Sequence, residues 1–267
     1  MALTRPSNRA LTRPSNRALE LDRVQTPRGE LVLRQEGEHF DVISNGVFLI
    51  DTRNGESERL LIVAALDLLA GNATLPPTKL AFRPDSSGAM PHCPRPPWRV
   101  LIGGLGVGFS LVEALSSADV DAVTVIEVEP TVVEWHRSYL AHITSEALRD
   151  RRSKVVVTDI REYLATAEEL YDGICLDVDN GPDWTVTDAN ASLYGDDGTA
   201  LLVSRLAPGG VLTVWSAAQS PAYERVLRRH FGKVEVIEIP VPRGEPDVVF
   251  AATQAVSQTQ GRDSDSS

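Results

Sequence analysis

The sequence predicts an α/β fold in which a parallel sheet has helices on both faces, preceded by a small antiparallel β-domain. From residue 99 onward, short apolar runs alternate with helical stretches, which is the pattern of successive βαβ units. A glycine-rich segment at residues 103–108 directly follows the first of these runs. Before residue 57, the apolar runs are instead separated by short turns, as in a β-meander.

The chain of 267 residues is long enough for one large domain with a smaller one attached. Its start is an exact duplication: ALTRPSNR at residues 2–9 recurs at residues 10–17. This polar, proline-broken stretch predicts a disordered tail rather than a folded repeat. The predicted division is a disordered tail at 1–20, a β-domain at 21–56, a helix with a proline-rich linker at 57–97, the main domain at 98–253 and a second disordered tail at 254–267.

The β-domain is predicted from short β-rich runs around a strong turn signal. Apolar and turn residues alternate over 21–51, and Asn45-Gly46, a frequent two-residue hairpin turn, leads into a further apolar run. Residues 57–70 then predict a helix, with Ser57 as its N-cap and Gly71 as its C-terminal stop.

Five apolar runs with helices between them predict the parallel part of the large sheet. The predicted strands are 99–102, 120–128, 154–158, 171–178 and 211–215, and the predicted helices are 109–115, 130–140, 160–170, 196–206 and 221–230. Two last runs, 234–239 and 248–252, are joined by a short Pro/Gly loop and predict an antiparallel hairpin at one edge. Together these elements predict the Rossmann-like, seven-stranded sheet of class I methyltransferases.

Composition excludes several classes of function. The chain has 26 Lys and Arg against 37 Asp and Glu, a formal net charge of −11, whereas nucleic-acid binding through phosphate contacts needs a basic surplus. No apolar run reaches about 18 residues, and no apolar signal core follows the first basic residues, so we expect a cytoplasmic protein without membrane contact. Cys93 and Cys175 are too few for a four-thiolate zinc site, and Cys175 is predicted to be a buried apolar residue.

The glycine-rich segment predicts a ligand-binding turn. Gly103 and Gly104, then Gly106 and Gly108, lie between a strand and a helix, where glycines allow a tight turn and close approach of the backbone to a ligand. Glu127 ends the second strand about 20 residues later, which is where a carboxylate accepts hydrogen bonds from ribose hydroxyls. The spacing is not G-x-G-x-x-G, so a nucleoside is expected rather than a dinucleotide.

Asp159 follows the third strand, and ligands of open α/β sheets bind beyond the carboxyl ends of the strands. Its carboxylate could accept from an adenine amine while Ile160 covers the ring. The same aspartate is also well placed to be the N-cap of the following helix, and one side chain can serve both roles.

An acidic cluster follows the fourth strand, where Asp177, Asp179 and Asp183 lie within seven residues, with Asn180 between them. Grouped carboxylates raise one another's pKa or hold a cation. No histidine lies nearby in the sequence, so a metal site is not predicted. We expect Asp177 to orient an amine and accept its proton, while Asp179 or Asp183 holds the positive charge.

Two aromatic side chains have simpler explanations beside the functional ones. His136 is expected to be a surface or hydrogen-bonded helix histidine rather than a catalytic one. Trp215, at the end of the fifth strand, could equally line the substrate pocket or pack in the core.

These motifs, in this order, resemble the spermidine synthase (polyamine aminopropyltransferase) family. The matching segments are VLIGGLGVG, VIEVEP, VVTDIREYL, YDGICLDVDNGP with SLYGDDG, and NGVFLIDTRNGESERLL in the β-domain. The resemblance covers roughly residues 21–252. It implies a two-domain, metal-free enzyme, a homodimer or homotetramer, that transfers an aminopropyl group from decarboxylated S-adenosylmethionine to a small amine in polyamine biosynthesis.

The resemblance also implies roles for single residues. Glu127 matches the ribose-binding glutamate of the family, Asp159 the adenine-contacting aspartate and Asp177 the catalytic aspartate. Asn180 stands where the family has a second aspartate, with Asp179 beside it. Tyr194 matches a tyrosine of the substrate site.

Two departures leave the substrates open. Gly106 replaces the loop aspartate that holds the amine of the aminopropyl group in the family. The Asp-Glu and Tyr-His-Glu residues that shape the polyamine pocket are replaced by residues 54–56 and 58–60. The alternatives are therefore methyl transfer from S-adenosylmethionine to a small molecule, and a non-catalytic homologue that only binds a nucleoside.

Overall fold

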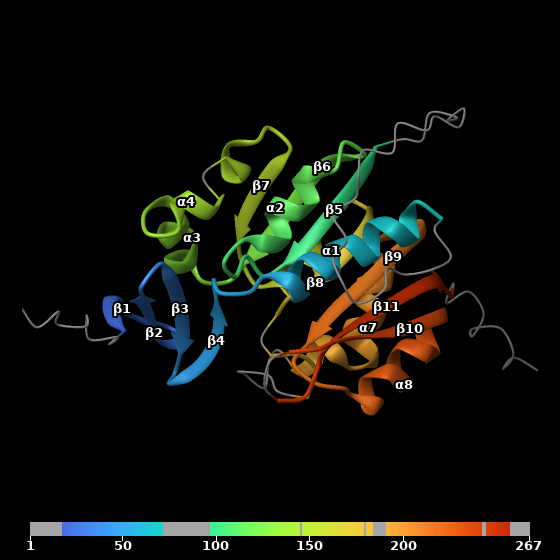
Figure 1. Cartoon of the computed structure of the whole chain (residues 1–267). Coiled ribbons are helices and arrows are strands. Elements are labelled where there is room, and N and C mark those ends of the chain that lie inside the picture. The colour runs from blue at the N-terminus through green and yellow to red at the C-terminus, as the bar shows by residue number, and fades with distance from the viewer. Residues whose placement is uncertain are drawn as a thin grey trace, which may run out of the picture. The chain divides into compact units, whose positions relative to one another are not determined.

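The computed structural model describes residues 18–71, 97–144, 146–178, 180–183, 191–241 and 244–256 (Figure 1). Several predictions lie outside these residues. They concern the duplicated segment, most of the proline-rich linker, Cys93, Asp179 and nearly all of the C-terminal tail. The chain divides into two compact units, Met1–Arg53 and Asn54–Ser267.

The first unit is a four-stranded antiparallel meander, as predicted. Its strands pair in the order β1-β2-β3-β4, with bounds β1 (Leu19–Thr26), β2 (Gly29–Glu36), β3 (His39–Ser44) and β4 (Val47–Asp51). Strand β1 thus begins at Leu19, inside the stretch predicted as tail. The turn between β3 and β4 has positive φ at both Asn45 (51°) and Gly46 (79°), which is why this residue pair forms it.

The second unit contains a seven-stranded sheet in the order β10-β11-β9-β8-β5-β6-β7 (Figure 1). Its strands are β5 (Trp98–Gly103), β6 (Val120–Glu127), β7 (Ser153–Val157), β8 (Tyr171–Leu176), β9 (Leu206–Ser216), β10 (Phe231–Ile239) and β11 (Asp247–Ala255). The strands β5 to β9 pair in parallel, and β11 pairs antiparallel with both β9 and β10. The predicted sheet and its edge hairpin are confirmed.

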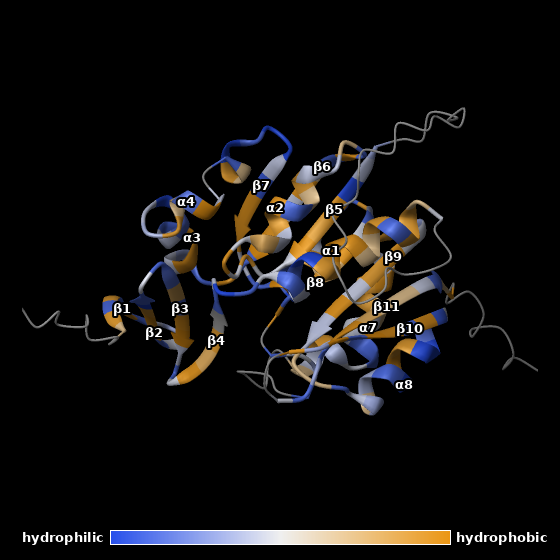
Figure 2. Ribbon diagram, viewed as in Figure 1, coloured by the Kyte–Doolittle hydropathy of each residue, from blue (hydrophilic) through white to orange (hydrophobic). Residues whose placement is uncertain are grey.

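Helices cover both faces of this sheet. They are α1 (Glu56–Leu69), α2 (Phe109–Ser116), α3 (Pro130–Arg137), α4 (Ala141–Thr144), α5 (Ile160–Thr166), α7 (Asp196–Ser204) and α8 (Pro221–His230). One packed series runs from α1 through α2 to α4 and α3, and another from α5 through α7 to α8. Figure 2 shows hydrophobic colour concentrated on the strands between them, while α8 alternates hydrophobic and hydrophilic residues.

Three helices end earlier than predicted, at Arg137, Thr166 and Ser204, and side-chain hydroxyls bind carbonyls in the last turn of each. Helix α3 stops at Arg137, and the Ser138 hydroxyl donates to the Glu134 carbonyl at 2.9 Å. Helix α5 stops at Thr166, whose own hydroxyl donates to the Glu162 carbonyl at 2.9 Å. Such local hydrogen bonds compete with continuation of a helix.

The prediction that Ser57 caps α1 is wrong. The helix begins one residue earlier, and the Asn54 side chain accepts from the Glu56 N–H at 3.1 Å. The buried Ser57 hydroxyl instead donates to the Glu58 carboxylate at 3.0 Å. The predicted stop is confirmed, because Gly71 has a left-handed φ of 77° just after the helix.

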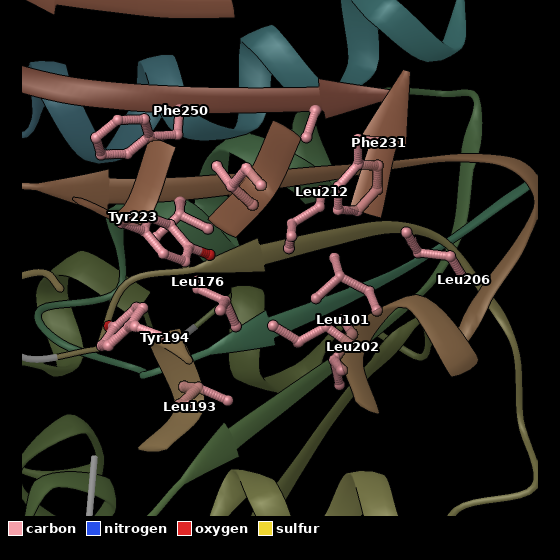
Figure 3. Packing of buried hydrophobic residues seen from close by; sticks show 14 of the residues in the cluster. Leu101, Leu176, Leu193, Tyr194, Leu202, Leu206, Leu212, Tyr223, Phe231 and Phe250 are labelled. Atoms are coloured by element: carbon pink, nitrogen blue, oxygen red, sulfur yellow. The ribbon is translucent and has the colours of Figure 1, made fainter. Parts of the chain in front are cut away.

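The main core lies on the α5–α7–α8 face of the large sheet (Figure 3). Tyr223 is its centre of aromatic packing and makes edge-to-face contacts with Tyr194 at 5.4 Å and Phe250 at 5.5 Å between ring centroids. Cys175 is fully buried in β8, as predicted, and burial raises the pKa of its thiol to about 12. Among the described residues, no helix is both long and apolar enough to span a membrane.

Candidate active site

The glycine loop connects β5 to α2 at the carboxyl edge of the sheet, where the strand order reverses between β5 and β8. Crevices at such switch points are the ligand sites of open α/β sheets. Gly104, Gly106 and Gly108 have φ values of 92°, 52° and 90°. A side chain at Gly104 would also collide with the backbone carbonyl of Asp177, so the loop lies directly against the end of β8. Only glycine fits that position without a shift of the backbone.

Glu127, at the end of β6, holds the glycine loop in place. Its side chain is 7% exposed, and its two carboxylate oxygens accept from the Leu105 N–H at 2.9 Å and the Glu129 N–H at 2.8 Å. Burial raises the pKa of Glu127, and the backbone hydrogen bonds act against that rise. Each carboxylate oxygen keeps a further lone pair, so the group can also accept from the hydroxyls of a sugar.

Asp159 and Ile160 lie on the neighbouring side of the loop. Ile160 packs against Gly103, where a Cβ would come within 2.5 Å of its Cδ1 atom. Asp159 is the N-cap of α5, since its side chain accepts from the Arg161 N–H at 2.8 Å, and the Arg161 guanidinium lies 3.2 Å from the other oxygen. Burial favours the neutral acid, but the bonds from Arg161 outweigh it and lower the pKa of Asp159. The N-cap role is confirmed, and contact with a base stays a prediction.

Asp177 follows β8 and meets the same loop. Its N–H donates to the Gly103 carbonyl at 2.8 Å, and its side chain is partly buried. The pKa of Asp177 is raised well above its ordinary value by burial first and then by the charges of Glu58, Asp247 and Glu127. A carboxylate with a raised pKa is a stronger base than an ordinary aspartate, which suits Asp177 to accept a proton beside the glycine loop.

Two of these neighbours were not predicted. Glu58, in the first turn of α1, is 7% exposed, and burial followed by the charge of Asp247 raises its pKa. Burial also raises the pKa of Asp247, the first residue of β11, although the polar side-chain groups of Ser57 and Trp215 act against the rise. Asp177, Glu58 and Asp247 are called the carboxyl cluster below. The sequence offered one indication of Glu58, because a charged residue there interrupts the mostly apolar buried residues of α1.

The remaining predicted substrate residues are distributed differently. The Asn180 carbonyl accepts from the Ala217 N–H at 3.1 Å, which ties the segment after β8 to the end of β9. The Asp183 side chain is exposed. Tyr194 is buried in the main core (Figure 3), and its hydroxyl donates to the Val178 carbonyl at 2.7 Å. Tyr194 therefore supports the backbone next to Asp177, and direct contact of these residues with a substrate stays a prediction.

Burial and the like charges of its members make the carboxyl cluster costly to ionise, which a nearby cation would relieve. Arg59 lies next to Glu58, but its guanidinium stacks 4.3 Å from the Phe109 ring centroid and lies 3.9 Å from the Glu113 carboxylate. Among the described residues, no group of three or more His, Cys, Asp or Glu side chains is arranged to hold a metal ion. The cluster is therefore suited to an organic cation, such as a protonated amine.

The strand order, the glycine loop after the first strand of the sheet and the acidic residue ending the second define a class I methyltransferase-like fold. The chain belongs to the spermine/spermidine synthase family, because the family model of the spermine/spermidine synthase domain matches residues 88–233, more than half of the sequence.

The similar curated proteins are named polyamine aminopropyltransferases. Polyamine aminopropyltransferase 2 of Pseudomonas aeruginosa is 34% identical over 157 residues, which are 55% of this chain and 43% of the relative. The polyamine aminopropyltransferase of Oceanobacillus iheyensis is 34% identical over 131 residues, 48% of this chain and 24% of the relative. The chain thus spans less than half the length of these curated relatives.

Solved structures share the fold at low identity. A spermidine synthase in complex with the transition-state analogue AdoDATO superposes with a TM-score of 0.67 at 17% identity, covering 89% of this chain and 74% of that one. Spermidine synthase from Thermotoga maritima gives a TM-score of 0.66 at 18% identity, covering 89% and 73%. Both likenesses support the predicted fold class.

Proposed function

We propose that this protein is a transferase that moves the aminopropyl group of decarboxylated S-adenosylmethionine to an amine acceptor in polyamine biosynthesis. The observation that carries the proposal is the direct contact between the glycine loop and Asp177, which puts a donor loop beside a carboxyl group of raised pKa. The family, and the aminopropyltransferases among the relatives, support the same reaction.

On the donor side, we assign the nucleoside to the glycine loop, with its ribose hydroxyls on Glu127. Asp159 stays ionised because its pKa is lowered, so it can accept from the adenine amine, and Ile160 covers the ring. The glycines let the backbone approach the sulfonium closely. Asn180, Asp183 and the undescribed Asp179 belong to the segment that would border the acceptor.

The proposed reaction is a direct displacement. The acceptor nitrogen attacks the aminopropyl carbon bonded to sulfur, the carbon–sulfur bond breaks, and its electron pair stays on the sulfur of methylthioadenosine. The proton that the nitrogen loses passes to Asp177. Holding the amine in line with the sulfonium supplies the rest of the rate enhancement, and no covalent enzyme intermediate is needed.

On the acceptor side, the carboxyl cluster is proposed to bind the ammonium groups of the amine. The charges of Glu58 and Asp247 raise the pKa of Asp177 and so oppose its ionisation. A cation offsets that effect, so an acceptor with more than one positive charge gains most. We therefore propose a di- or polyamine rather than a monoamine.

Replacement of Glu58 by glutamine tests this assignment. We expect the KM for a diamine acceptor to rise about tenfold, the value of one charged hydrogen bond. Removal of a negative neighbour also lowers the pKa of Asp177, so the acidic limb of the pH–rate profile shifts to lower pH. Glu56→Gln removes the same charge from the same helical turn and is the matched control. An unchanged KM together with an unmoved acidic limb would exclude Glu58 from the acceptor site.

The overall reaction is tested by incubating the full chain with decarboxylated or intact S-adenosylmethionine and a panel of mono-, di- and polyamines. Methylthioadenosine as the product supports aminopropyl transfer. S-adenosylhomocysteine would instead establish methyl transfer, the alternative that the missing side chain at Gly106 favours. Neither product with any amine would contradict the proposed function.

We propose a cytoplasmic homodimer or homotetramer that acts on small molecules without a metal ion, and the resemblance to the spermidine synthase family supports this. We also propose that residues 21–56 form a small β-domain and residues 98–253 the catalytic domain.

A further inference from the structure

His136 is a buried imidazole that the proposed reaction does not use. It lies in α3 with 1% of its surface exposed. Its Nε2 atom is 2.9 Å from the Gly106 carbonyl oxygen, and its Nδ1 atom is 2.8 Å from the Thr144 hydroxyl. The prediction of a hydrogen-bonded helix histidine is thus confirmed, but one of its partners is the glycine loop.

The partners define the tautomer of the ring. A carbonyl oxygen only accepts hydrogen bonds, so the proton of the neutral ring lies on Nε2 and is donated to Gly106. The Nδ1 atom then accepts from the Thr144 hydroxyl. Burial lowers the pKa of His136, which agrees with a neutral ring.

This hydrogen bond fixes one peptide of the loop. In a trans peptide the carbonyl and the following N–H point in opposite directions, so holding the Gly106 carbonyl toward α3 turns the Val107 N–H away from α3. Close packing supports the same arrangement. A side chain at Gly108 would collide with Thr144 and come within 3.3 Å of the imidazole Cε1 atom.

We propose that His136 is a positioning residue for the sulfonium donor, which acts by holding the Gly106–Val107 peptide in the conformation that the donor binds. The inference rests on the proposed function, because it takes the glycine loop as the donor site. Glycines at positive φ leave this loop with many alternative conformations. If the donor binds only one loop conformation, its apparent affinity falls with the fraction of molecules that have that conformation before binding.

Two substitutions of His136 separate this role from simple packing. Glutamine can place an amide N–H about where the imidazole Nε2 lies, whereas asparagine is too short to reach Gly106. We expect His136→Asn to weaken methylthioadenosine binding about tenfold in calorimetry. The KM for the donor rises with it and kcat stays within about twofold, because the hydrogen bond acts on binding. His136→Gln keeps most of the wild-type affinity.

The control is His142→Asn, the same substitution at an exposed histidine of the neighbouring helix α4, which is expected to bind as the wild type does. A folded His136→Asn variant with wild-type affinity overturns the proposal. Glutamine and asparagine variants that lose affinity equally also overturn it, because packing alone would explain that result.

A second measurement needs neither a variant nor the donor. Nitrogen-15 NMR of the wild-type imidazole is expected to show a proton on Nε2 that exchanges slowly with water and no proton on Nδ1. A proton on Nδ1 overturns the proposal, even if the variants fail to fold. If the wild type does not bind methylthioadenosine but the Nε2 proton is present, then the proposed function fails and the loop contact stands.

Discussion

Replacement of Asp177 by asparagine is expected to lower kcat by about 10²- to 10⁴-fold, the usual contribution of a general base. The change keeps the size of the side chain and removes its ability to accept a proton. Affinity for methylthioadenosine should stay close to that of the wild type, because the nucleoside contacts assigned here come from Glu127, Asp159 and Ile160. Steady-state kinetics with decarboxylated S-adenosylmethionine and a diamine, together with calorimetry, measure both effects.

The same variant is expected to be more stable than the wild type at neutral and alkaline pH. The pKa of Asp177 is raised in the folded state, so the folded protein binds this proton more tightly than the unfolded chain does. Stability is therefore lost as pH rises from the ordinary pKa of aspartate, about 4, toward the raised value. Asparagine removes that loss, so the gain in Tm over the wild type should vanish near pH 4.

Asp183→Asn serves as the control, because the Asp183 side chain is exposed and its replacement should leave Tm and kcat nearly unchanged. An Asp177→Asn variant that retains more than about a tenth of wild-type kcat would remove Asp177 from the role of base, since a general base contributes at least about 10²-fold. A lower Tm of Asp177→Asn at alkaline pH would contradict the raised pKa of Asp177.

The part of the site that could be predicted is the part held by the parallel strands. Parallel strands bring their carboxyl ends to one edge, so residues that directly follow β5, β6, β7 and β8 meet without any knowledge of side-chain packing. Glu127 ends its strand, and the glycine loop, Asp159 and Asp177 come after the ends of theirs. Their convergence can therefore be predicted from the alternation of strands and helices alone.

Glu58 and Asp247 follow no such rule. One comes from a helix before the sheet and the other from an antiparallel strand near its edge, and only tertiary packing brings them to Asp177. Helix ends were also mispredicted, because local backbone and hydroxyl hydrogen bonds in the last turn, such as those of Ser138 and Thr166, are not visible in the pattern of apolar residues. The contact between His136 and Gly106 could not be predicted either, since the two residues are 30 positions apart in the sequence.

Introduction of an aspartate at Gly106 is expected to shift the preference between the two sulfonium donors toward decarboxylated S-adenosylmethionine. The φ of Gly106 is 52°, in the left-handed region that aspartate and asparagine enter more readily than most residues, so the loop should tolerate the change. The new carboxylate repels the carboxylate of intact S-adenosylmethionine and attracts the amine of the decarboxylated donor. We expect the ratio of their dissociation constants to change by about 100-fold, or about 2.7 kcal/mol.

Gly106→Asn is the matched control, because asparagine has nearly the same shape and backbone preference without the charge. It should leave the ratio of the two dissociation constants near its wild-type value, and a shift as large as that caused by aspartate would show that sterics, not charge, act at this position.

The ratio of the two dissociation constants in the wild type separates the two candidate reactions. With no side chain at Gly106, the loop has no charge to repel intact S-adenosylmethionine, and its backbone N–H groups are suited to accept the donor's carboxylate. If the wild type nevertheless prefers the decarboxylated donor by about 100-fold, then another carboxylate, for which the carboxyl cluster is the nearest source, holds the aminopropyl amine. Methyl transfer would then be excluded as the alternative reaction.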